Sequence, residues 1–109
     1  MNEISMFVRT PKYAFIEKDG RARVSKGNPV GCFVARKEFD EQNGKDVIIF
    51  GYSFVHECDV FKKKLGKKIA SGRANFDFND EFYVVHKISP KYRNKFKKFV
   101  ERAHKYFQI

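Results

Sequence analysis

The sequence predicts an α+β fold, in which an antiparallel sheet of about four strands comes first and two amphipathic helices pack on it. Two observations predict this fold: β-branched and aromatic runs separated by turn residues as far as residue 56, and a helical spacing of apolar residues after that point. A chain of 109 residues fits a single domain, 1–109, and its 13 Phe and 5 Tyr supply an aromatic core. This composition argues against a disordered chain despite the high charge.

Residues 12–18 and 21–26 are expected to form the first hairpin, because the Asp19-Gly20 dipeptide between them suits the left-handed backbone angles of a tight turn. Residues 27–29, Gly-Asn-Pro, then break the chain, since proline lacks a backbone donor and restricts the residue before it. We therefore expect two strands here, followed by a change of direction.

Residues 30–39 and 47–56 form a second expected hairpin, with a longer polar loop between them. The second of these runs has apolar side chains on both faces. One face carries Ile48, Phe50, Tyr52 and Phe54, and the other carries Val47, Ile49 and Val55 with Gly51. This pattern predicts a central strand that is covered on both sides, at least in part.

The first helix is expected over residues 59–71, with Asp59 as its N-cap and Gly72 as its stop. Arg73, just past that end, is placed to hydrogen-bond the last carbonyls. Apolar residues recur at four-residue steps and predict one buried face: Phe61, Leu65 and Ile69. Gly66 costs such a helix about 1 kcal/mol relative to alanine, and the close approach of another backbone would account for it.

The second helix is expected over residues 90–107 and has the strongest start signal in the chain. Ser89 supplies an N-cap, and Pro90 occupies the first helical position. Apolar residues at helical intervals then predict a stripe that faces the core: Tyr92, Phe96, Phe99, Val100, Ala103 and Phe107.

The net charge of +10 is concentrated in the second half of the chain. Residues 1–58 carry 9 basic and 8 acidic side chains, whereas residues 59–109 carry 14 basic and 5 acidic ones. Lysines line the surface that the apolar stripe of each expected helix leaves free. Like charges four residues apart repel by a few tenths of a kcal/mol per pair, so a surface selected only for solubility would more often mix the signs.

These basic side chains predict a surface that binds DNA or RNA phosphates: Lys62, Lys63, Lys64, Lys67, Lys68, Arg73, Lys91, Lys95, Lys98, Arg102 and Lys105. Lysine outnumbers arginine 16 to 7, which suits phosphate contact more than the reading of bases, so we expect little sequence specificity. A lysine-rich face that only meets solvent is the alternative for the same residues. A module that binds and modulates or inhibits an acidic host protein is the alternative function.

The acidic segment 75–86 lies between the two basic ones. It either folds over the edge of the core and pairs with the surrounding lysines, or anchors a protein partner through its aromatic residues, Phe76, Phe78, Phe82 and Tyr83. Within it, residues 82–86 have the composition of a strand and form either a strand or an extended connector.

The chemistry-bearing residues predict no metal, cofactor or catalytic site. The string His56-Glu57-Cys58-Asp59 has suitable residue types, but the remaining Cys and His residues, Cys32, His86 and His104, show no zinc-ligand spacing. Cys58 as a nucleophile needs a nearby base, and a lone cysteine before a helix is more often a small buried residue. A nuclease that uses His86 and His104 is a weaker alternative, since the sequence does not bring these residues together.

The most distinctive motif of the chain is Asp59-x-Phe61-x-Lys63-Lys64-x-Gly66-x-x-Ile69-Ala70-x-Gly72-Arg73-Ala74. Two further stretches accompany it, Gly31-Cys32-Phe33-Val34-Ala35 and Phe99-Val100-x-Arg102-Ala103-x-Lys105-Tyr106-Phe107. Together, over roughly residues 30–107, they resemble a group of small proteins of uncharacterised activity, many of them encoded by bacteriophages. The resemblance implies a phage-type accessory protein inside a bacterial host cell, and it brings no activity, cofactor or site residue with it.

The chain shows no membrane-spanning or secretion segment. Its longest uninterrupted apolar runs, such as residues 47–50, are far short of the roughly 20 residues that a membrane span needs. Its first residues, MNEISMFVRTPK, lack the apolar stretch of a secretion signal. We therefore expect a cytoplasmic protein with no membrane contact, whose partner is nucleic acid or an acidic host protein.

Overall fold

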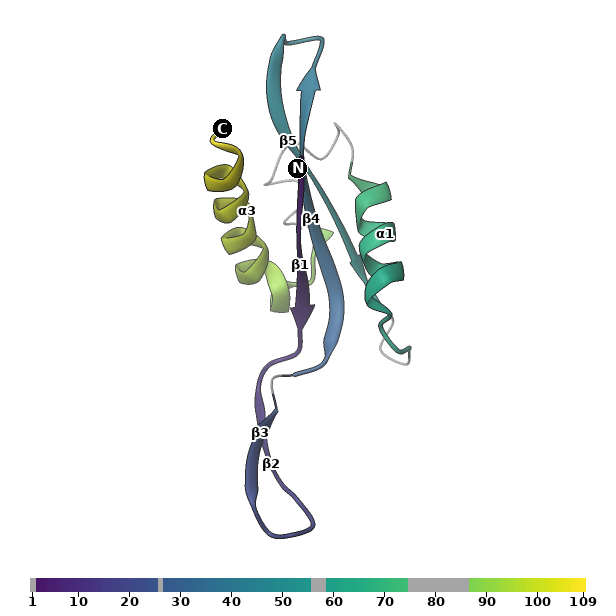
Figure 1. Cartoon of the computed structure of the whole chain (residues 1–109), viewed down its shortest axis with the longest axis vertical. Coiled ribbons are helices and arrows are strands. Elements are labelled where there is room, and N and C mark those ends of the chain that lie inside the picture. The colour runs from purple at the N-terminus through teal and green to yellow at the C-terminus, as the bar shows by residue number, and fades with distance from the viewer. Residues whose placement is uncertain (1, 26, 56–58, 75–86) are drawn as a thin grey trace.

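A computed structural model describes residues 2–25, 27–55, 59–74 and 87–109 of the chain. Its strands are β1 (Glu3–Arg9), β2 (Tyr13–Ile16), β3 (Ala22–Ser25), β4 (Pro29–Asp40) and β5 (Lys45–Phe54). They are followed by the helix α1 (Lys63–Arg73), the 3₁₀ turn η2 (Pro90–Tyr92) and the helix α3 (Arg93–Phe107). β1, β4 and β5 form an antiparallel sheet with β4 in the middle, whereas β2 and β3 form a separate hairpin. The molecule measures 61 × 26 × 26 Å, and the hairpin extends along the longest axis, beyond the end of the sheet (Figure 1).

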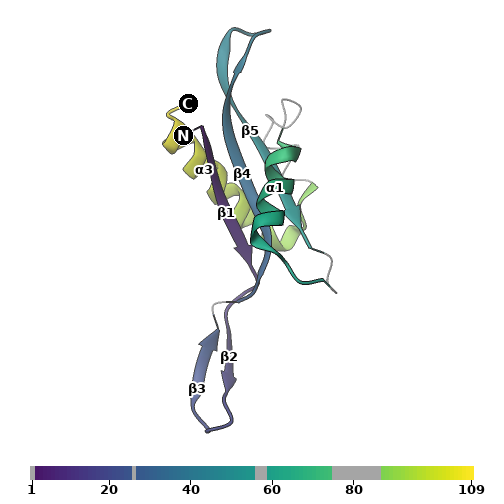
Figure 2. The same cartoon turned by 45° about the vertical axis from the view of Figure 1, so that its right-hand side comes forward.

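The three-stranded sheet lies between the two helices. Figures 1 and 2 show α3 on one face and α1 on the other. The α+β class, the antiparallel pairing and the two helices are confirmed, but the described residues hold five strands in two sheets in place of the four expected. β4 rather than β5 is the central strand. Both faces of β5 are nevertheless covered, as its apolar pattern predicts, because the helices pack on opposite sides.

β1 is the strand that the sequence analysis did not anticipate. Ile4 and Val8 point to one face of the sheet and join the core beneath α3. Phe7 points to the other face, where its ring lies 6.1 Å from that of Phe61, edge to face. β1 therefore contributes to the packing on both sides of the sheet.

An aromatic core holds α3 on the sheet. Phe33 of β4 and Phe50 of β5 meet Phe96 at ring-centroid distances of 5.1 and 5.6 Å, both edge to face. Such pairs contribute about 0.5–1.5 kcal/mol each beyond the apolar area that they bury. The predicted stripe is confirmed: Tyr92 is half-buried, and buried with the core are Phe96, Phe99, Val100, Ala103 and Phe107.

The turn that leads into α3 begins at the predicted residue, but the predicted side-chain cap is not formed. Pro90 is the first residue of η2, as predicted, but the side chain of Ser89 makes no capping bond. The carbonyl of Ser89 instead accepts a hydrogen bond from the backbone N–H of Tyr92 at 2.9 Å. α3 ends at Phe107 as expected, and no described helix is long and apolar enough to cross a membrane.

α1 differs most from its prediction. It begins at Lys63 rather than at residue 59, because the preceding Lys62 is extended (φ −105°, ψ 115°), so Asp59 is not its N-cap. It continues through Gly72 to Arg73, so the glycine is not its stop. The expected buried face is also wrong. Leu65 and Ile69 are 53% and 38% exposed, and the buried residues of the helix are Gly66 and Ala70.

Close contacts explain the orientation of α1. A Cβ on Gly51 of β5 would lie 2.0 Å from the carbonyl oxygen of Ala70, so the helix backbone meets the strand backbone directly. Gly66 makes room for a side chain rather than for another backbone, since a Cβ there would lie 2.2 Å from the ring of Phe61. The carbonyl of Gly66 accepts a hydrogen bond from Ser53 Oγ at 2.7 Å. Leucine and isoleucine do not fit into so narrow a space, and small residues face the sheet instead.

The β2–β3 hairpin, called the arm below (residues 12–25), is confirmed as a hairpin but not as part of the main sheet. Gly20 in its turn has a left-handed conformation, with φ +81°. Hydrogen bonds fix its root: the Thr10 N–H donates to the Asn28 carbonyl at 2.9 Å, and the Asn28 N–H donates to Thr10 Oγ1 at 2.8 Å. At the same root Gly27 has φ +86°, and a Cβ there would lie 2.0 Å from the Thr10 carbonyl oxygen. The arm is therefore attached to the main sheet by two closely spaced segments of the chain.

Candidate nucleic-acid interface

Lysines occupy the N-cap position and the first two residues of α1, and two more follow in the next turn. All five are exposed: Lys62, Lys63, Lys64, Lys67 and Lys68. The first turn of α1 has no acidic residue and no side-chain cap, so its free N–H groups and the positive end of the helix dipole add to the charge of the lysines. In the described part of the chain, no carboxylate forms an ion pair with any of the five. The start of α1 is therefore suited to an anion.

Arg73, expected in the same basic set, faces β5. Its Nη1 donates to the carbonyl of Tyr52 at 3.3 Å. The carbonyls at the end of α1 are instead bound by Arg36 of β4, whose Nη1 and Nη2 donate to the carbonyls of Ser71 and Ala74 at 3.5 and 3.3 Å. The carbonyls at the end of α1 are thus bound by an arginine from the central strand, whereas the described bond of Arg73 goes to β5.

The basic residues expected on η2 and α3 differ in exposure: four are exposed, and one is half-buried and contacts the backbone of β1. The exposed members are Lys91, Lys98, Arg102 and Lys105. Lys95 is half-buried, because its Nζ donates to the carbonyl of Arg9 at 2.6 Å and lies 5.9 Å from the ring centroid of Tyr92. Lys95 therefore stabilises the packing of α3 against the end of β1, and the four exposed members remain available to a ligand.

The two basic helices lie on opposite faces of the sheet, so their lysines do not form one flat surface. Both helices nevertheless begin at the same end of the molecule, the end from which the arm extends (Figures 1 and 2). Two contacts with β1 fix this arrangement. Lys63 Nζ lies 5.4 Å from the ring centroid of Phe7 on one face, and Lys95 binds the carbonyl of Arg9 from the other. The positive ends of both helix dipoles thus flank the carboxyl end of β1.

The arm adds exposed basic residues at this end that the sequence analysis did not include: Lys12, Lys18, Arg21 and Arg23. Arg23 Nε lies 2.9 Å from Glu17 Oε1, and Arg21 Nε lies 3.7 Å from Asp19 Oδ2. Exposed pairs of this kind contribute about 0–1 kcal/mol, so a phosphate can replace the carboxylate readily. The Asp19-Gly20 signal reveals the hairpin, but nothing in the sequence shows that it leaves the main sheet.

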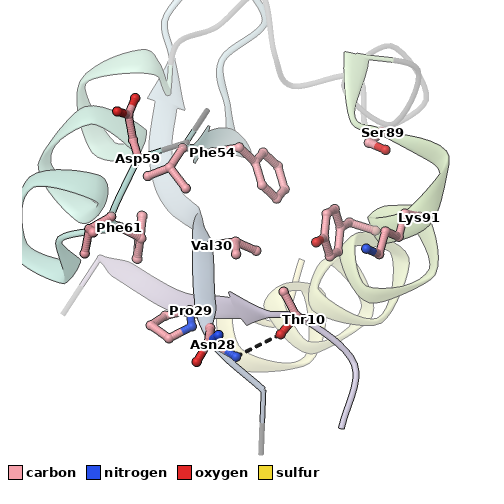
Figure 3. Close-up of a pocket in the computed structure, with 12 residues that line it drawn as sticks. Thr10, Asn28, Pro29, Val30, Phe54, Asp59, Phe61, Ser89 and Lys91 are labelled. Atoms are coloured by element: carbon pink, nitrogen blue, oxygen red, sulfur yellow. Dashed lines mark hydrogen bonds between the residues drawn. The ribbon is translucent and has the colours of Figure 1, made fainter. Parts of the chain in front are cut away.

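A hollow of about 750 Å³ lies between the start of β4, the end of β5 and η2 (Figure 3). The rings of Phe54 and Tyr92 stack at 5.2 Å in its wall. A second hollow, of about 400 Å³, continues along α1, where its lining includes Phe61, Leu65 and Ile69. These apolar walls suit an apolar group of a ligand or partner rather than a phosphate.

Most of the residues considered for catalysis lie outside the described part of the chain: His56, Glu57, Cys58 and His86, as does the whole acidic segment 75–86 with its strand-like residues 82–86. His104 is exposed, and its Nδ1 lies 2.8 Å from the carbonyl oxygen of Ile109. Cys32 is buried in β4, and desolvation raises the pKa of its thiol to about 11. Among the described residues, no three His, Cys, Asp or Glu side chains gather as metal ligands would.

Comparison with protein-family models, with curated proteins and with solved structures gives no match to this chain.

Proposed function

We propose that this protein is a small basic accessory protein that binds nucleic acid through its lysine-rich helices, with little sequence specificity. One observation carries the proposal: the lysines at the start of α1 are exposed without carboxylate partners among the described residues, and α3 begins at the same end of the molecule, on the other face of the sheet. The charge repulsion within each helix is a cost that a bound polyanion removes.

Physical chemistry supports nucleic acid as the polyanion. Lysines that neutralise phosphates release condensed counterions, which makes binding favourable at low salt and steeply dependent on salt. The uncapped start of α1 provides further N–H donors for phosphate oxygens. An ammonium group contacts phosphate as a point charge and reads bases poorly, so the excess of lysine over arginine agrees with weak sequence preference. The resemblance to small phage-encoded proteins supports a role inside a bacterial host cell.

Fluorescence anisotropy with labelled single- and double-stranded DNA and RNA tests this proposal. We expect binding at about 50 mM salt and a steep loss of affinity as the salt concentration rises. The variant Lys64→Gln/Lys68→Gln should lower the slope of log K against log salt by about 2, because each phosphate contact contributes about 0.9.

A matched control, Lys37→Gln/Lys45→Gln, removes the same charge from the β4–β5 hairpin at the opposite end of the molecule. It should change the slope by less than about 0.5. Absence of binding at about 50 mM salt, or equal slopes for the two variants, contradicts the proposal.

A protein-binding module is the second candidate, and a different observation favours it. Leu65 and Ile69 are exposed beside the smaller hollow, and Val60 at its rim is 85% exposed. An apolar surface of this kind, surrounded by lysines, suits an acidic partner with an apolar anchor residue. A pull-down from nuclease-treated host lysate separates the candidates: a stoichiometric protein that is retained by the wild type and lost with Leu65→Asp favours this one, whereas a protein released by nuclease does not.

A further inference from the structure

The two faces of the arm differ in chemistry. The pairing of β2 with β3 places Ala14 opposite Val24 and Ile16 opposite Ala22, so these four side chains share one face. This apolar face of the arm carries no charge and no hydrogen-bonding side chain, although Ile16 and Val24 are 76% and 69% exposed. The opposite face carries Tyr13, Phe15, Arg23 and Ser25. An isolated two-stranded hairpin is marginally stable in water, so a solvent-exposed apolar face on one indicates a surface that a ligand covers.

Hydrogen bonds attach the root of the arm to the end of the main sheet. The paired hydrogen bonds between Thr10 and Asn28, and the bond from Arg9 Nη1 to the Gly27 carbonyl at 3.2 Å, hold its root against the end of β1. It extends from the same end of the molecule at which both helices begin (Figure 2). A ligand that covers the arm therefore also meets the basic starts of α1 and α3.

A second copy of this chain does not fit the apolar face of the arm. The face consists of four side chains, two of them alanine, whereas a stable protein interface uses roughly 20–30 residues on each side. The arm also carries four basic and two acidic side chains, so two arms in contact would repel each other. The same charge favours a polyanion.

We propose that the arm lies in the major groove of double-stranded DNA, with its apolar face toward the base edges and its basic side chains toward the phosphates. This inference rests on the proposed nucleic-acid binding and narrows it to duplex DNA. The major groove of B-DNA is about 12 Å wide and admits a two-stranded β-ribbon, whereas the minor groove is about 6 Å wide, and the major groove of A-form RNA is too narrow for side chains to read. Alanine, valine and isoleucine contact the 5-methyl group of thymine, which discriminates weakly among sequences.

The variant Ile16→Ser/Val24→Ser tests the inference, because serine removes the apolar surface of both side chains, whereas threonine would keep a methyl group that also contacts thymine. We expect its affinity for duplex DNA to be about tenfold lower than that of the wild type, and its affinity for duplex RNA and single strands to be unchanged. The salt slope should not change, since no charge is removed. The control Phe39→Ser/Ile109→Ser removes two exposed apolar side chains away from the arm and should bind like the wild type.

A second measurement uses the wild-type protein and so does not depend on the folding of a variant. Duplex DNA with uracil in place of every thymine lacks the 5-methyl groups of the major groove, and we expect it to bind several-fold more weakly than the thymine duplex. Equal affinity for both duplexes, together with unchanged duplex binding by Ile16→Ser/Val24→Ser, contradicts the placement of the arm in the major groove but not the binding of nucleic acid by the helices. If the wild type binds no nucleic acid at low salt, the proposed function and the placement of the arm both fail.

Discussion

The carbonyl oxygen of Ala70 lies so close to the Cα of Gly51 that a Cβ on the glycine would sit 2.0 Å from it. The same Cβ would lie 2.8 Å from the backbone nitrogen of Ala74. Both neighbours are main-chain atoms, which cannot rotate out of the way as a side chain can. The position of α1 on the sheet therefore depends on the absence of one methyl group in β5.

Gly51→Ala should lower the free energy of unfolding by about 1–3 kcal/mol, because the added methyl group forces α1 away from the sheet. Urea denaturation followed by circular dichroism measures the change. Gly72→Ala is the matched control: among the described residues, no atom beyond the helix's own backbone lies within 4 Å of the Cβ it adds, and alanine has the higher helix propensity, so the free energy of unfolding should rise by up to about 1 kcal/mol. Equal effects of the two substitutions would disprove the close backbone contact.

Lys95→Ala should mainly lower the stability of the protein, whereas Lys98→Ala should mainly weaken the binding of nucleic acid. Loss of the bond to the Arg9 carbonyl leaves that oxygen without its ammonium partner, so Lys95→Ala should lower the free energy of unfolding by about 1–2 kcal/mol. Lys98 is exposed, and its removal should change stability by less than about 0.5 kcal/mol while weakening nucleic-acid binding. Thermal melts and anisotropy on both variants test this. A stability loss that is larger for Lys98→Ala contradicts the assignment.

Arg36→Met should destabilise the protein by about 1–3 kcal/mol, since it removes a guanidinium that donates hydrogen bonds to several elements of the fold. Besides the carbonyls at the end of α1, the guanidinium lies 3.4 Å from Glu3 and 2.8 Å from Glu38. Methionine keeps the apolar stem, so the measured change in a urea melt reports the polar contacts. Arg21→Met, which removes an exposed arm arginine, serves as the control and should leave the midpoint within error.

The buried thiol of Cys32 should resist modification in the folded protein. Its pKa is raised to about 11 by desolvation, so at pH 8 little reactive thiolate is present. In a Cys58→Ser background, labelling of Cys32 by a disulfide reagent should proceed only as fast as the protein unfolds, and added urea should accelerate it. Because the folded pKa lies above the ordinary value of 9.0, ionisation disfavours the fold, and stability from this group should fall as the pH rises from about 9 to about 11. Rapid labelling at pH 8 without denaturant would contradict this placement.

The elements that could be predicted from the sequence are those whose own side chains bury a large apolar area. α3 has the predicted end and the predicted buried stripe, because six apolar residues at helical intervals leave one orientation available. The hairpins were also predictable, since Asp19-Gly20 and the β-branched run that became β5 are local signals.

What the sequence did not reveal depends on contacts between distant residues. Leu65 and Ile69 have the spacing of a buried face, but the surface opposite α1 is the bare backbone of Gly51, which accepts only small residues. The candidate site was predicted as a set of lysines, and their division between two faces of the sheet depends on the topology. Lys95 could not be assigned to a structural role, because its partner, the Arg9 carbonyl, lies 86 residues earlier in the chain.

The two sides of the sheet also set different limits on sequence change. On the α3 side, Phe33, Phe50 and Phe96 fill space with large side chains, and neighbouring side chains can partly refill the space that a smaller apolar residue leaves. On the α1 side, the two backbones touch because position 51 has no side chain, and any residue other than glycine would add atoms there. Descendants of this sequence should therefore accept some apolar substitutions at the aromatic positions while keeping glycine at position 51.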